Sequence, residues 1–156
     1  MQCAVVEFAR NVLNIKDAHS SEFVAKTKNK VIDLMASQKR VKKKGGTMRL
    51  GAYPCDIKKG SKSFQAYGKT KIQERHRHRY EFNNKFLDRF NKAGMLTTGM
   101  NPDLGLVEIV ELKDHPWFIA SQFHPELKST VESPHPLFVS FVKAALDKKS
   151  NGISKK

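Results

Sequence analysis

Acidic residues are scarce in this chain of 156 residues, in which 15 Asp and Glu stand against 29 Lys and Arg. The formal net charge of +14 raises the chance of a polyanionic partner such as nucleic acid or a nucleotide. Much of the excess is lysine in residues 26–30, 39–44 and 148–156, with little aromatic interleaving on which bases could stack. We therefore expect solvated lysine loops and a basic disordered tail over 149–156, and we do not expect nucleic acid as the partner.

Cysteine and long apolar runs are scarce as well. Cys3 and Cys55 are the two cysteines, without metal-binding spacing and without a reason to pair, which favours a reducing cytoplasm. No apolar run approaches the length of a membrane span. Residues 1–13 carry polar side chains within their apolar spacing, so they do not resemble a signal peptide. The sequence predicts no membrane partner.

The apolar residues that are present, 39% of the chain, suffice for one globular domain with a core. Their spacing and the turn residues between them predict mixed helices and strands with an antiparallel portion in the middle, an α/β or α+β class. In chain order we expect a helix over 3–13, a strand or turn over 31–35, strands over 47–53 and 72–83, a helix over 84–93, strands over 104–112 and 117–123, and a helix over 136–146.

The stretch SQFHPELKS contains His124 and Glu126, separated by Pro125. Side chains two apart in an extended segment leave the same face, so the imidazole and the carboxylate should lie together. A carboxylate beside an imidazole fixes its tautomer and stabilises its charged form, as in catalytic triads. A surface or structural histidine at the end of a strand fits the same local pattern.

The stretch ERHRHRY, residues 74–80, alternates arginine and histidine. His76 and His78 on one face suit zinc, but a third ligand is not evident and the neighbouring arginines repel a cation, so we expect no metal. An arginine-rich strand that contacts nucleic acid, a solvated edge strand, and an arginine that binds a small carboxylate all remain open.

Several longer stretches together resemble the glutamine amidotransferase domain of the CTP synthase family: GGTMRLGAYPC, YGKTKIQERHRHRYEFNN, GLVEIVEL, HPWFIASQFHPELKS and PHPLF. The resemblance covers residues 1–148 and implies the C-terminal part of a class I, triad-type amidotransferase domain. Such a domain is flavodoxin-like α/β with a central, mostly parallel sheet, here lacking its N-terminal strands. The activity implied is glutamine hydrolysis that supplies ammonia for the ATP-dependent amination of UTP to CTP.

In the family pattern the catalytic set is cysteine, histidine and glutamate, and His-Pro-Glu matches His124 and Glu126. Met1 and Gln2 match the end of the nucleophile elbow, so the nucleophilic cysteine would lie upstream of Met1. Cys3 and Cys55 do not match it. The resemblance therefore implies a chain that is inactive as given.

The resemblance also implies a set of glutamine contacts: Met1 and Gln2 at the elbow, Glu22 for the α-amino group and Arg79 for the α-carboxylate. ATP and magnesium would bind in a synthetase domain outside these residues, GTP would be an allosteric effector, and the enzyme would be a homotetramer. The alternative function is a basic module that binds nucleic acid through arginines of residues 75–79.

Overall fold

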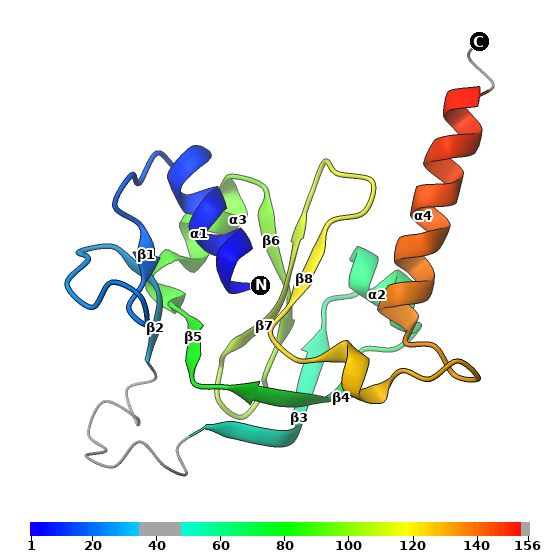
Figure 1. The fold of residues 1–156 in the computed structure, drawn as a ribbon, viewed down its shortest axis with the longest axis horizontal. Helices are drawn as coiled ribbons and strands as arrows, with labels where there is room; N and C mark the ends of the chain where they lie inside the picture. Colours follow the sequence, from blue (N-terminus) through cyan, green and yellow to red (C-terminus); the bar gives the residue numbers. More distant parts are fainter. Residues whose placement is uncertain (35–47, 154–156) are drawn as a thin grey trace.

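Two β-sheets form the framework of the part of the chain that the computed structural model describes, residues 1–34 and 48–153 (Figure 1). One sheet has the order β1-β2-β5 and the other the order β4-β3-β6-β7-β8. The strands are β1 His19–Ser20, β2 Lys30–Leu34, β3 Arg49–Ile57, β4 Lys71–His78, β5 Tyr80–Phe82, β6 Met95–Met100, β7 Val107–Leu112 and β8 Ile119–Ser121. The helical elements are α1 Gln2–Asn11, α2 Lys62–Tyr67, η1 Asn84–Phe86, α3 Leu87–Lys92, η2 Pro125–Lys128 and α4 Pro136–Ile153.

The strand pairs of the larger sheet are all antiparallel, whereas β1 and β2 run parallel and β2 and β5 antiparallel. Among the described residues the expected parallel sheet is therefore limited to the β1–β2 pair. Short connections such as the turn between β7 and β8 favour antiparallel neighbours, because a parallel pair needs a long crossover. The α/β class with an antiparallel middle portion is confirmed.

Helix α1 buries the apolar face that its spacing predicts. Val5, Phe8 and Ala9 are buried, and the Phe8 ring stacks on Phe90 of α3 with centroids 5.6 Å apart. Val12, directly after the last helical residue Asn11, is 49% exposed. Burial of such side chains is worth roughly 1.5–3 kcal/mol each, so α1 is held mainly by this face.

The segment predicted as one strand over 72–83 is divided between the two sheets. Its alternation holds through β4, where Glu74 and His76 are buried and Arg75 and Arg77 are exposed. At Arg79 the chain bends, leaves the larger sheet and enters β5 of the smaller one. The interpretation as a solvated edge strand was half right: β4 is an edge strand, but its inner face is packed.

Several elements were not predicted, among them β1, α2 and β6, and others differ in length. Helix α2 begins after the capping Ser61 and ends at Gly68, which has a φ of 67°. Strand β6, with the sequence MLTTGM, includes Gly99, a residue type depleted in strands, and was not predicted. Helix α4 extends through residues 149–153, which the sequence assigned to a disordered tail. The lysine-rich segment 39–44 lies outside the described residues.

Helix α4 projects away from both sheets at the C-terminal end of the described chain (Figure 1). Among the described residues, no helix is both long and apolar enough to cross a lipid bilayer.

Candidate active site

His124 and Glu126 form a hydrogen-bonded pair at the surface. The His124 Nδ1 atom lies 2.6 Å from Glu126 Oε1, and the side chains are 38% and 59% exposed. Only His124 is extended, whereas Pro125–Lys128 forms a 3-10 turn, so the turn rather than strand alternation brings the side chains together. Partial burial would raise the pKa of the Glu126 carboxyl, but the hydrogen bond and charge of His124 hold it below its ordinary value. The carboxylate is therefore ionised and orients an accessible imidazole.

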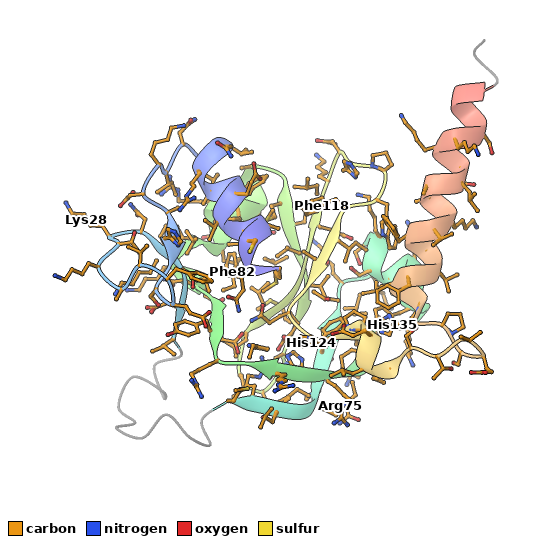
Figure 2. All side chains as sticks on the ribbon, in the orientation of Figure 1. Lys28, Arg75, Phe82, Phe118, His124 and His135 are labelled. Atoms are coloured by element: carbon orange, nitrogen blue, oxygen red, sulfur yellow. The ribbon has the colours of Figure 1, made fainter. Side chains whose placement is uncertain are left out.

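Strand β4 supports the loop that presents this pair (Figure 2). The His124 backbone N–H donates to the Arg75 carbonyl at 2.9 Å, and Lys128 Nζ donates to the Gln73 carbonyl at 2.6 Å. Both acceptors lie on the edge of β4 that does not pair with β3. The arginine-histidine strand thus fixes the position of His124, a role that its composition did not suggest.

A buried carboxylate below this loop adds a second anchor. Glu74 Oε1 lies 3.2 Å from His135 Nε2 and accepts a hydrogen bond from the Tyr67 hydroxyl at 3.1 Å. Burial would raise the pKa of Glu74, but His135 first, then Lys128 and Tyr67, lower it below its ordinary value. An ionised Glu74 therefore ties β4 to α2 and to the start of α4.

The Tyr80 carbonyl connects three parts of the expected site. It accepts a hydrogen bond from Gln2 Nε2 at 3.1 Å and another from Gln122 Nε2 at 2.7 Å. Gln2 begins α1, Gln122 lies two residues before His124, and Tyr80 follows Arg79. Sequence reasoning missed Gln122, which lies between Ser121 and Phe123 and carries no local signal of its role.

Gln2 and Glu22 line one cavity of about 420 Å³ between α1 and the segment after β1. Its lining residues are Gln2, Cys3, Val6, Glu7, Arg10, Asn11, His19, Ser20, Glu22 and Phe23. The Glu22 backbone N–H donates to Ser20 Oγ at 3.2 Å, which orients the turn that presents the exposed Glu22 side chain. The structure thus brings two of the expected glutamine contacts to one cavity.

The other expected contacts lie around this cavity rather than in its lining. Arg79 is half-buried at the bend between β4 and β5, next to the Tyr80 carbonyl that Gln2 contacts. The Met1 side chain packs against the main hydrophobic core. Of the cysteines, Cys3 is exposed on α1 and Cys55 is buried. Burial first, and nearby carboxylates second, raise the pKa of the Cys55 thiol, so it is a poor nucleophile.

A buried ionic network lies on the inner face of β4. Arg49 donates to Glu108 at 2.8 Å and to Glu81 at 3.2 Å, and all three side chains are at most 4% exposed. Burial raises the pKa of Glu81 to about 7, against the lowering effect of Arg49. Two carboxyl groups thus share one guanidinium in a dry interior, a costly arrangement unless geometry compensates for desolvation.

His76 and His78 join this network as neutral side chains. Their ring nitrogens, Nδ1 and Nε2, lie 2.8 Å apart. Burial, followed by the charge of Arg49, lowers the pKa of His76 to about 3 and that of His78 to about 4. Glu108 supplies the third candidate metal ligand that the sequence did not reveal, since the ligand atoms of the three residues lie within 4.8 Å. Arg49 already provides a cation at Glu108, and we assign no metal.

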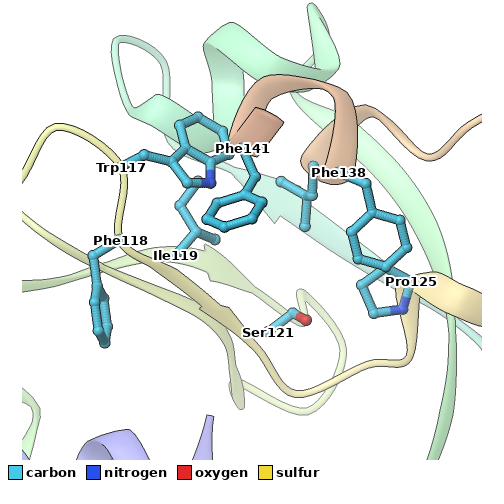
Figure 3. A pocket seen from close by; sticks show the side chains of 8 residues that line it. Trp117, Phe118, Ile119, Ser121, Pro125, Phe138 and Phe141 are labelled. Carbon is cyan, nitrogen blue, oxygen red and sulfur yellow. The ribbon is translucent and has the colours of Figure 1, made fainter. Parts of the chain in front are cut away.

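An apolar groove of about 330 Å³ lies between β8 and α4, beside the loop that carries His124 (Figure 3). Its lining residues are Trp117, Phe118, Ile119, Ser121, Pro125, Leu137, Phe138 and Phe141. The groove offers no charged group to an amino acid, so it does not fit the polar ends of glutamine.

Comparison with known proteins shows one family along the chain. Residues 1–144 match the profile of the family described as glutamine amidotransferase class-I. The chain is 70% identical over 147 residues to a CTP synthase of Cytophaga hutchinsonii, covering 94% of the chain and 27% of that protein. It is 65% identical over 145 residues to a CTP synthase of Christiangramia forsetii, covering 93% and 27%. The chain thus spans about a quarter of the length of these curated relatives.

A solved structure agrees with the sequence relatives. The glutaminase domain of Trypanosoma brucei CTPS, with bound acivicin, superposes with a TM-score of 0.87 at 37% identity. The match covers 94% of this chain and 57% of that one. These findings do not support the alternative of a nucleic-acid module.

Proposed function

We propose, because the chain belongs to the class-I glutamine amidotransferase family, that it forms the C-terminal part of a glutaminase within a CTP synthase. The observation that carries this proposal is the 2.6 Å contact between His124 and Glu126 on a loop held by β4. An accessible imidazole oriented by a carboxylate supplies the general base and the orienting group of a catalytic triad, which also needs a nucleophile.

His124 takes the proton of the attacking thiol and later gives a proton to the departing ammonia. Glu126 holds the imidazole through Nδ1, which leaves Nε2 for the reacting groups. We infer that neither Cys3 nor Cys55 is the nucleophile and that the cysteine comes from upstream of Met1 in the family pattern. The 156-residue chain alone would then be inactive.

Free glutamine carries an ammonium and a carboxylate, and the site offers one partner for each. Glu22 binds the ammonium at the edge of the cavity that it shares with Gln2. Arg79 binds the carboxylate, for which a guanidinium provides two parallel donors. Met1 and Gln2 contribute the remaining contacts, those of Met1 through its backbone because its side chain packs on the core.

In the complete enzyme the ammonia would aminate UTP to CTP in a synthetase domain that binds ATP and magnesium. GTP would act as an allosteric effector, the assembly would be a homotetramer, and the enzyme would be cytoplasmic. This part of the proposal rests on the similarity of the chain to CTP synthases.

The proposal is tested with a chimera in which this chain replaces the matching 147 residues of the Cytophaga hutchinsonii CTP synthase. We expect CTP formation from glutamine and from ammonia. A chimera that uses ammonia but not glutamine, although folded, would contradict the proposal.

The chain alone supplies the second arm of the test. We expect no ammonia release from glutamine above background, because loss of the nucleophile of a triad costs on the order of 10⁶-fold in turnover. Turnover by the chain alone that Cys3→Ser abolished would identify Cys3 as the nucleophile instead.

A further inference from the structure

Gln122 connects the loop of His124 to the bend at Arg79. Its side chain is 6% exposed, and its backbone N–H donates to the Glu108 carbonyl at 2.8 Å. The side-chain Nε2 donates to the Tyr80 carbonyl at 2.7 Å and lies 2.9 Å from His78 Nδ1. The two acceptors are the residues on either side of Arg79.

The orientation of the Gln122 amide follows from these contacts. The Tyr80 carbonyl can only accept, so the amide must present its NH₂ group there. His78 Nδ1 lies 2.9 Å from the same Gln122 Nε2 and 3.2 Å from the Tyr80 carbonyl, and His78 Nε2 lies 2.8 Å from His76 Nδ1. The Gln122 amide thus contacts the residues on both sides of Arg79.

The bend needs such support because Arg79 belongs to neither sheet. Strand β4 ends at His78 and β5 begins at Tyr80. Gln2 supports the bend from α1 through the same Tyr80 carbonyl. Gln122 holds both sides of the bend, and it belongs to the segment that leads directly into His124.

We propose that Gln122 is a positioning residue that fixes Arg79 relative to His124, so that the carboxylate of glutamine is bound at the correct distance from the catalytic base. The inference rests on the proposed function and deepens it. Gln122 acts through Arg79 and His124 and does not touch the substrate.

The test is Gln122→Met in the chimera, since methionine has a similar length but no donor. We expect the KM for glutamine to rise about 10-fold or more, because a small misplacement of a binding group is costly. The ammonia-dependent rate should stay within about twofold of that of the parent chimera, since that reaction does not use Glu22 and Arg79, the proposed glutamine contacts. Gln65→Met, at an exposed position on α2, is the matched control and should change neither rate.

A structural defect is separated from a positioning defect by Val110→Ala, which removes buried apolar groups from the neighbouring strand β7. At an equal loss of thermal stability, only Gln122→Met should raise the KM. An unchanged KM in Gln122→Met, or an equal rise in Val110→Ala, would overturn the inference while the parent chimera still uses glutamine. A parent chimera without glutamine-dependent activity would overturn the proposed function and the inference with it.

Discussion

Two regions of the molecule place histidine beside carboxylate, and they differ in their access to solvent. His124 and Glu126 are 38% and 59% exposed, whereas His76 and Glu108 are completely buried. The exposed pair is free to exchange protons with a substrate. The buried set is kept in one charge state by desolvation and by Arg49. Histidine and glutamate are therefore available for catalysis at the surface pair, whereas in the buried set they stabilise the fold.

Removing the exposed base should have the largest effect. In the chimera we expect His124→Ala to lower glutamine-dependent turnover on the order of 10⁴-fold, because the nucleophile loses its proton acceptor. Ammonia-dependent CTP formation and thermal stability should change little. Equal loss of both activities in a folded variant would place His124 in structure rather than catalysis.

Breaking the buried network should act on stability instead. Arg49→Met leaves Glu81 and Glu108 without their cation and should cost about 3–5 kcal/mol in the free energy of unfolding. Urea unfolding followed by Trp117 fluorescence measures this loss. Arg77→Met, on the exposed face of the same sheet, should cost less than about 0.5 kcal/mol. If Arg49→Met and Arg77→Met lowered the free energy of unfolding by similar amounts, the buried network would not be a special source of stability.

Substitution of Arg79 or Glu22, the proposed contacts for the two charged ends of glutamine, should have an intermediate effect on glutamine use. Arg79→Ala should lower kcat/KM for glutamine by about 10- to 100-fold, the equivalent of a charge-assisted hydrogen bond of roughly 1.5–3 kcal/mol. Glu22→Ala should weaken binding from the ammonium end. Neither variant should affect the ammonia reaction, and a loss of both activities would assign Arg79 to structure.

The pH dependence of stability should show the smallest effect. The unfolded state binds more protons than the native state at His78, whose pKa is lowered to about 4, so stability falls as the pH drops from 6.5 towards 4. Glu81 acts in the opposite direction, since its raised pKa of about 7 makes stability fall as pH rises from about 4.5 to 7. His78→Asn should therefore reduce the slope between pH 6 and 5 by about 1 kcal/mol per pH unit. An unchanged slope would mean that His78 is charged in the native state.

Local pattern was sufficient for the elements that carry their own signal. The apolar face of α1, the turn before β8 and the last helix follow from spacing and from turn residues. The His-Pro-Glu motif and the longer stretches of residues 45–55 and 67–84 were enough to place the chain in its family. These features depend on neighbours in the sequence, which local reasoning can see.

The remaining features depend on contacts between distant residues. The strand predicted over residues 72–83 is divided at Arg79 between the two sheets, and the partners of β4 lie up to 61 residues away, as in the Glu74–His135 pair. Gln122 acquires its role only where β8 passes the bend, and Glu108 joins His76 and His78 only through the pairing of strands. Composition and motif therefore established the family and the candidate base, whereas burial and long-range hydrogen bonds decided which histidines are available for chemistry, because desolvation is a property of the packed interior.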